Sequence, residues 1–183
     1  MRQIQLRLPW LTAAGAVVSL LSVSLLSIPA LAVPFTATNL VTDDQAAHPA
    51  QITDPGLKNA WGITFSPTGE FWVSSTGAGT SPVYSVDSAS QATTKLPLTV
   101  AIPGDGSVTG QVFNGSTSFN NNRFLFVSED GTVSGFRPEL GTTGVRPAET
   151  IAPASPHNNY KGVTFVAFRD TIIFTRQTSR PAR

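Results

Sequence analysis

Short apolar runs separated by turn-forming residues make up most of the chain after its first 32 residues. The runs are rich in β-branched and aromatic residues, as at residues 61–65, 71–74 and 124–128. Runs of this length and composition favour β-strands over helices. Asp130-Gly131 follows the last of these runs, and an Asp-Gly pair between strand-like segments is a strong signal for a β-hairpin. The pattern therefore predicts an all-β fold of short antiparallel strands.

A motif with the pattern Gly-x-x-Phe recurs three times in the chain. It begins at Gly62, Gly110 and Gly162, at intervals of about 50 residues, close to the length of one four-stranded β-propeller blade. Glycine suits the inner strand of a blade, where backbones approach closely around the central axis. We therefore expect a partial β-propeller of about two to three antiparallel blades over residues 33–170. A β-sandwich is the alternative, but it gives no reason for the repeat.

The first 32 residues follow a different pattern, with no acidic residue and with two arginines as their only charged residues. An apolar run rich in Leu, Val, Ala and Ser covers residues 8–28 and is followed by a proline and by Ala30 and Ala32. Small residues at these two places form the site at which signal peptidase cleaves. We therefore predict a signal-peptide helix over residues 1–32, removed after Ala32. A retained membrane anchor is the alternative.

Composition narrows the possible classes of function. Cysteine is absent, which excludes disulfides, thiolate catalysis and cysteine-ligated metals. Acidic and basic residues nearly balance after residue 32 and no basic cluster occurs, so nucleic acid is not an expected partner. No second long apolar segment follows, so the mature form is not expected to be embedded in a membrane. We expect it in the periplasm, on the cell surface or outside the cell.

Four longer segments of the chain resemble one family of proteins. The segments are ATNLVTDD (37–44), DPGLKNAWGI (54–63), IPGDGSVTG (102–110) and FLFVSEDGT (124–132). They resemble uncharacterised exported bacterial β-propeller proteins, some of which carry a C-terminal PEP-CTERM sorting tail. The resemblance implies a propeller longer than this chain, and it carries over no catalytic residue because the family has no established activity. The chain departs from the family by having Ala60 where proline is usual.

Three repeats do not close a ring, because propellers have about four to eight blades. We therefore expect either association with another copy through the open blade edges or a fragment of a longer protein. When the reading frame is shifted near Asp170, the codons allow Asn-Tyr-Phe-Tyr-Ala-Thr-Asn-Phe, which resembles the family's sequence at this place. Our hypothesis is an out-of-frame or disordered tail over residues 171–183, which the nucleotide sequence of the gene would test.

Few residues belong to a recognisable chemical motif. The sequence holds no catalytic, metal-binding or cofactor-binding motif, and its two histidines, His48 and His157, lie beside prolines in predicted loops. Asp105 and Asp130 are the candidate ligand-binding residues, for the case in which an acidic cluster lines the mouth of the channel in a complete ring. A purely structural role in those turns is the alternative. Trp61, Phe71 and Trp72 could form a surface that stacks on a ligand, and packing between blades is the alternative.

These features favour an exported binding or interaction module, whose partner is an unknown ligand or an envelope or extracellular protein. Propellers gather loops from every blade at one rim, so a binding site there needs no local motif. The main alternative is an enzyme of the lactonase or quinoprotein-dehydrogenase type, assisted by calcium. A truncated product without function is the third possibility.

Overall fold

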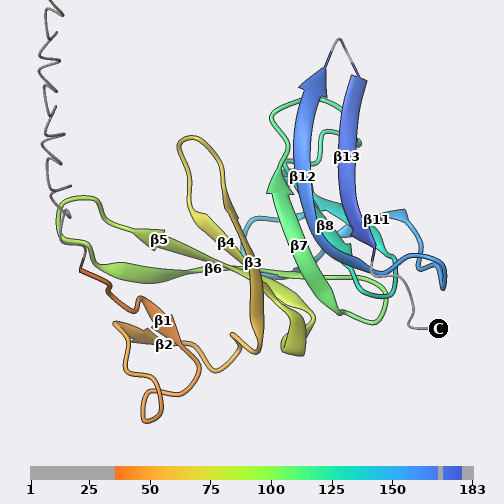
Figure 1. The fold of residues 1–183 in the computed structure, drawn as a ribbon. Coiled ribbons are helices and arrows are strands. Elements are labelled where there is room, and N and C mark those ends of the chain that lie inside the picture. The colour runs from red at the N-terminus through yellow and green to blue at the C-terminus, as the bar shows by residue number, and fades with distance from the viewer. Residues whose placement is uncertain (1–35, 169–170, 179–183) are drawn as a thin grey trace, which may run out of the picture. The chain divides into compact units, whose positions relative to one another are not determined.

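The computed structural model describes residues 36–168 and 171–178 (Figure 1). In chain order, the strands are β1 (Val41–Thr42), β2 (Ile52–Thr53), β3 (Ala60–Phe65), β4 (Phe71–Ser75), β5 (Thr80–Val86), β6 (Thr93–Ala101), β7 (Val108–Phe113), β8 (Phe124–Ser128), β9 (Val133–Phe136), β10 (Gly144–Pro147), β11 (Glu149–Ala152), β12 (Tyr160–Phe168) and β13 (Thr171–Thr178).

The helical content of the described residues is limited to two short 3-10 helices, η1 (Thr76–Ala78) and η2 (Pro138–Leu140). The prediction of an all-β fold is therefore confirmed for this part of the chain. None of its helices is long and apolar enough to cross a membrane. The predicted signal peptide, with Ala30 and Ala32 at its cleavage site, lies outside the described residues.

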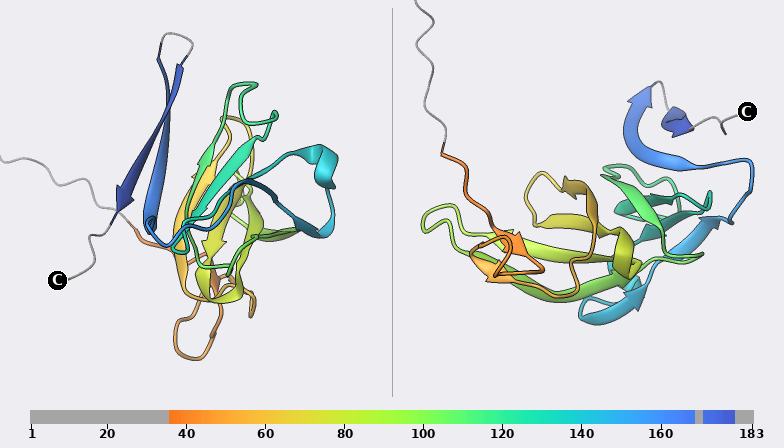
Figure 2. Two further views of the ribbon diagram at one scale, coloured as in Figure 1. Left: turned by 90° about the vertical axis from the view of Figure 1, so that its right-hand side faces the viewer. Right: turned by 60° about the horizontal axis from the view of Figure 1, so that its bottom comes forward.

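Three sheets follow one another along the chain (Figure 2). The first sheet has the strand order β10-β6-β5-β4-β3, the second has the order β11-β9-β8-β7, and the third consists of β12 and β13. Consecutive strands within each sheet pair antiparallel, whereas β10 joins the edge of the first sheet in parallel with β6. A short parallel pair, β1 and β2, precedes the first sheet.

Each sheet begins with one of the three glycine motifs. Gly62 lies in β3, Gly110 in β7 and Gly162 in β12, and each of these strands is an edge strand of its own sheet. Each strand also contains one extra residue relative to its hairpin partner, at the same place in the motif. These bulges lie between Ala60 and Ile63, between Val108 and Gly110, and between Tyr160 and Val163. The sequence repeat is therefore also a repeat of backbone structure.

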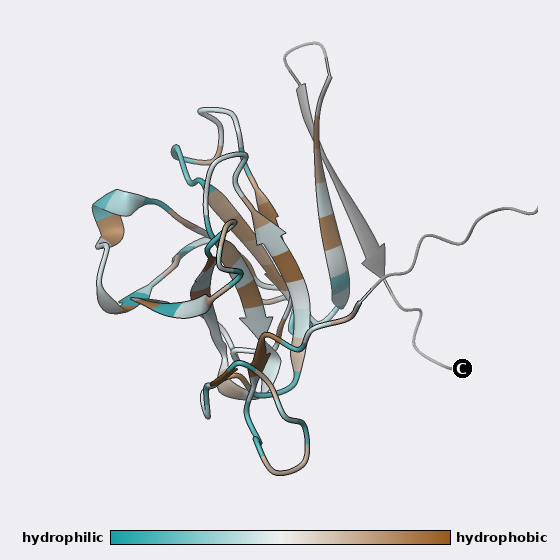
Figure 3. Cartoon of the chain, turned by 90° about the vertical axis from the view of Figure 1, so that its left-hand side faces the viewer, coloured by the Kyte–Doolittle hydropathy of each residue, from teal (hydrophilic) through white to brown (hydrophobic). Residues whose placement is uncertain are grey.

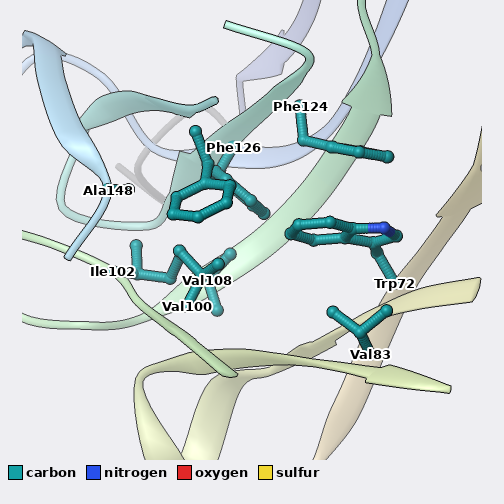
Figure 4. Packing of buried hydrophobic residues seen from close by; sticks show 9 residues of the cluster. Trp72, Val83, Val100, Ile102, Val108, Phe124, Phe126 and Ala148 are labelled. Atoms are coloured by element: carbon teal, nitrogen blue, oxygen red, sulfur yellow. The ribbon is translucent and has the colours of Figure 1, made fainter. Parts of the chain in front are cut away.

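The main hydrophobic core lies between the first and second sheets (Figure 4). The indole of Trp72 in β4 stacks on the ring of Phe124 in β8, with ring centroids 3.9 Å apart and planes inclined by 20°. Val83 lies on the other side of the indole (Figure 4), and Phe126 is fully buried in the same cluster. Apolar segments lie on the strands beside polar ones (Figure 3), and all five residues of β8 are buried.

The third sheet includes part of the segment predicted to be an out-of-frame or disordered tail. The backbone of Thr171–Thr178 forms β13 and pairs antiparallel with β12. Pairing of this backbone does not identify its reading frame, because many residue types are compatible with a strand. The frameshift hypothesis therefore stays a prediction, to be tested on the nucleotide sequence.

A buried carboxylate, that of Asp54, attaches the segment before β3 to strands β5 and β6 of the first sheet. Asp54 is 3% exposed, accepts a hydrogen bond of 2.5 Å from the hydroxyl of Tyr84 in β5, and pairs with Lys95 of β6 at 2.8 Å. Burial acts to raise the pKa of Asp54, but the hydrogen bonds from Lys95, Tyr84 and the backbone of Gly56 outweigh it, and the net pKa is lowered. The charged carboxylate is therefore the form that the fold favours.

This arrangement predicts an acid-dependent loss of stability. A carboxyl whose folded pKa lies below its unfolded pKa stabilises the fold above the unfolded value, about 3.9 for Asp, and loses that contribution as the pH falls toward the folded pKa. Replacing Asp54 by asparagine is expected to reduce the free energy of unfolding at pH 7 by about 1–3 kcal/mol. The difference between native protein and variant should shrink between about pH 5 and pH 2. Urea unfolding across this range measures it, and a difference that does not change with pH would contradict the assignment.

Candidate functional site

The three glycine-led strands lie side by side and line a groove of about 460 Å³, which we call the inner-strand groove. Their close approach depends on glycine. A Cβ atom at Gly62 would lie 2.8 Å from the carbonyl oxygen of Thr109, and one at Gly110 would lie 2.8 Å from the Cα of Gly162. The residues that line the groove are Ala60–Ile63 of β3, Thr109, Gly110 and Gln111 of β7, and Lys161, Gly162 and Val163 of β12.

The groove presents one cation beside one aromatic ring. The ammonium of Lys161 lies 5.6 Å from the ring centroid of Trp61 and pairs with the carboxylate of Glu129. The indole N–H of Trp61 donates to the side chain of Asn59 at 3.2 Å, and 47% of the Trp61 residue surface is exposed. An exposed ring beside a lysine can bind a ligand that combines an apolar face with a negative charge.

Gln111 holds the back of the groove together rather than facing a ligand. Its side-chain amide donates hydrogen bonds to the carbonyl oxygens of Gly62 and Trp72, and its side-chain oxygen accepts one of 2.8 Å from the hydroxyl of Ser81. These bonds join β7 to three strands of the first sheet. Because Gln111 is buried, the bonds satisfy polar atoms that would otherwise be costly to bury.

Asp105 and Asp130, the candidates from the sequence, are close together in the structure. The backbone N–H of Asp105 donates to the Asp130 carboxylate at 3.0 Å, and Thr132 donates to the same carboxylate through its backbone and its hydroxyl. The carboxylate of Asp105 accepts bonds from Ser107. Neither aspartate is among the residues that line the groove. Both carboxylates serve the turns in which they lie.

Hydrogen bonding also governs the charge of Asp130. Partial burial acts to raise its pKa, but bonds from the backbone of Asp105 and from the backbone and hydroxyl of Thr132 outweigh this effect. The net pKa of Asp130 is therefore lowered, and the carboxylate is charged at neutral pH. Its acceptor oxygens are occupied by the loop that follows β6 and by its own hairpin, so Asp130 is a link between two turns.

The described residues contain no group of three or more His, Asp or Glu side chains placed to hold a metal ion. The two histidines lie apart in different parts of the chain. His48 lines a cavity on the face of the first sheet that carries Ile63 and Phe71, together with residues of the segment 38–42. His157 is exposed in the loop between β11 and β12.

The structure separates the tryptophans that the sequence presented together. Trp72 is buried in the core, whereas Trp61 is exposed in the groove. Sequence reasoning did not single out Lys161 or Glu129. A signal existed for Lys161, because it directly precedes Gly162 in the third motif, just as Trp61 directly precedes Gly62 in the first. The motif therefore places both side chains at equivalent positions.

Comparison with known proteins gives no match, either to a family model or to a curated protein. The assignment of function therefore depends on the residues and geometry described above.

Proposed function

We propose that this chain is an exported β-propeller module that binds a ligand at the inner-strand groove. The observation that supports it is the equivalence of the three glycine motifs. Each motif lies in the first strand of successive sheets, each carries a bulge at the same place, and neighbouring motifs are in backbone contact. Inner strands of propeller blades are arranged in this way around a central axis. The family resemblance of four segments agrees with this proposal.

The groove favours a ligand with an apolar face and a carboxylate, such as an acidic oligosaccharide. Its sugar face would stack on Trp61, and its carboxylate would replace Glu129 as the partner of Lys161. Both side chains are accessible, and a charge-assisted hydrogen bond is stronger than a neutral one. An uncharged oligosaccharide would keep the stacking contact but lose the interaction with the ammonium.

Binding can be tested through the fluorescence of Trp61, with oligogalacturonate as the probe. We expect oligogalacturonate to change the emission of the native protein and to leave the Trp61→Phe variant unchanged. Replacing Lys161 by methionine should weaken binding by about 10-fold or more, since a hydrogen bond to a charged group contributes about 1.5–3 kcal/mol. Lys58→Met is the matched control, because Lys58 pairs with Asp43 outside the groove. Unchanged emission in the native protein, or equal losses in both lysine variants, would contradict this site.

Export is a separate part of the proposal and has its own test. When the full chain is produced in a bacterium, we expect the exported protein to begin at Val33, because cleavage follows Ala32. Replacing Ala30 or Ala32 by arginine should leave the precursor uncleaved, since the peptidase pocket admits only small side chains at these positions. N-terminal sequencing and mass spectrometry of the cell fractions measure both results. A mature protein that still begins at Met1 would overturn the prediction.

The enzymatic alternative needs free acidic groups near the channel. An enzyme of the lactonase or quinoprotein-dehydrogenase type would use carboxylates to hold calcium or to move protons. In the structure, the carboxylates of Asp105 and Asp130 instead accept hydrogen bonds from the two turns in which these residues lie. A binding module therefore accounts better for the described residues.

A further inference from the structure

We propose that two copies of this chain associate head to tail, with the front face of the first sheet of one copy covered by β12 of the other. The front face of a sheet is defined here as the side that carries Ile63 and Phe65 in the first sheet and the equivalent Gln111 and Phe113 in the second. The back face is the opposite side, which carries the glycine of the motif. The inference rests on the same equivalence of sheets as the proposed function.

The chain already contains this front-to-back contact between its first two sheets. The front face of the second sheet, with Phe113, Phe124 and Phe126, packs on the back face of the first sheet at Trp72. The backbone N–H of Phe113 donates to the hydroxyl of Thr64 at 3.2 Å. A front-face position of one inner strand is thus placed directly against a back-face position of the preceding one.

The same contact recurs between the second and third sheets. A Cβ atom at Gly110, on the back of β7, would lie 2.8 Å from the backbone nitrogen of Val163 in β12. The hydroxyl of Thr109 donates to the carbonyl oxygen of Tyr160 at 2.7 Å. In both contacts, the front face of one sheet lies on the back face of the preceding sheet. A contact between two different surfaces of this kind is heterologous, and a further copy can repeat it.

In the row of three sheets, two faces have no such front-to-back contact: the front face of the first sheet and the back face of β12 in the third sheet. On the front of the first sheet, Ile63 is 63% exposed and Phe65 is 58% exposed, although both positions are covered in the second sheet. On the back of β12, a Cβ atom at Gly162 would meet nothing within 4 Å, and Val166 is 46% exposed. One end is therefore an apolar front face, exposed at Ile63 and Phe65 next to the segment 38–42, and the other is a glycine-bearing back face.

These two faces are complementary, because each contact inside the chain also joins a front face to a back face. A second copy is therefore the occupant that fits, because its β12 offers the back face that the front of the first sheet lacks. Two copies joined at both ends would bring six sheets together, and propellers have about four to eight blades. We expect a closed ring and not a filament, because a heterologous contact forms a ring when its rotation closes and propeller blades close around a common axis.

The oligomeric state of the exported protein tests the proposal. Sedimentation and light scattering should give a dimer for the native chain. Phe65→Lys, at the front, and Val166→Glu, at the back, should each weaken association by more than about 100-fold, because each would bury an unpaired charge. Both positions are exposed in one copy and neither lines the inner-strand groove, so folding and binding of oligogalacturonate can be measured separately in the same variants.

A mixture of the two variants distinguishes the arrangement. Each variant keeps one native end, so an equimolar mixture of Phe65→Lys and Val166→Glu is expected to form dimers again, with the new charges facing each other at the second contact. Thr117→Lys is the control, because Thr117 is exposed in the loop between β7 and β8, outside both end faces, and the change should leave the dimer intact. A monomeric native protein, long polymers, or a dimer that survives Val166→Glu would overturn the proposal.

Discussion

Replacing Trp72 by alanine is expected to lower the free energy of unfolding by about 3–5 kcal/mol, the range found for large aromatic residues removed from a core. The Trp72 residue is only 6% exposed. Its indole stacks on Phe124 at 3.9 Å and also contacts Phe136, with centroids 5.7 Å apart. The substitution removes this contact between the first two sheets and leaves a cavity that the rigid strands on either side cannot fill.

Urea unfolding of the native protein and of the Trp72→Ala variant measures this effect. Trp61→Ala is the matched control, because the same side chain is removed from an exposed position. We expect the control to change stability by no more than about 1 kcal/mol, as is usual for surface substitutions. Equal losses in the two variants would show that the contact between the sheets does not stabilise the fold as described.

Replacing Gly110 by alanine is expected to destabilise the protein by about 1–3 kcal/mol, the usual cost of overpacking. The added Cβ atom would lie 2.8 Å from the Cα of Gly162 and 2.8 Å from the nitrogen of Val163. These atoms belong to the backbone of a paired strand, so they cannot rotate away as a side chain would. The strands β7 and β12 would have to separate, which weakens the contact between the second and third sheets.

Gly162→Ala is the control for this prediction, since a Cβ atom there meets nothing within 4 Å. Both alanine variants should be compared in a Phe65→Lys background, so that association of copies does not contribute to stability. We expect Gly162→Ala to change the free energy of unfolding by no more than about 0.5 kcal/mol. If the two alanines have the same effect, close backbone contact is not the reason for glycine at position 110.

Local sequence patterns predicted the strands well where turns and apolar runs agree. The run at 124–128 is β8, and the Asp130-Gly131 turn joins it to β9, with Gly131 at a φ of 86°. The pattern did not predict β10, whose four residues are all exposed and which pairs in parallel with β6. A strand that buries no face has no period of two, so only its distant partner determines it.

The candidate site was harder to predict, because it depends on contacts between distant residues. Lys161 and Glu129 are 32 positions apart in the sequence. Trp61 belongs to the first glycine motif and Lys161 to the third, yet their side chains are in contact. The sequence did single out Asp105 and Asp130 as candidate ligand-binding residues. It could not show that their carboxylates would be occupied by turn hydrogen bonds, because this depends on how the two loops are placed.

The bulge that recurs in β3, β7 and β12 has a consequence for how such a chain can change in length. Each contact between neighbouring sheets is made by a strand with the same bulge and the same glycine. In a repeat protein such a contact depends only on the two sheets that form it and not on the sheets beyond them. Duplication or loss of one whole sheet, with its glycine motif, would recreate a contact between sheets that the molecule already has. Loss of part of a sheet would leave a strand start without its hairpin, so viable length variants should differ by multiples of about 50 residues.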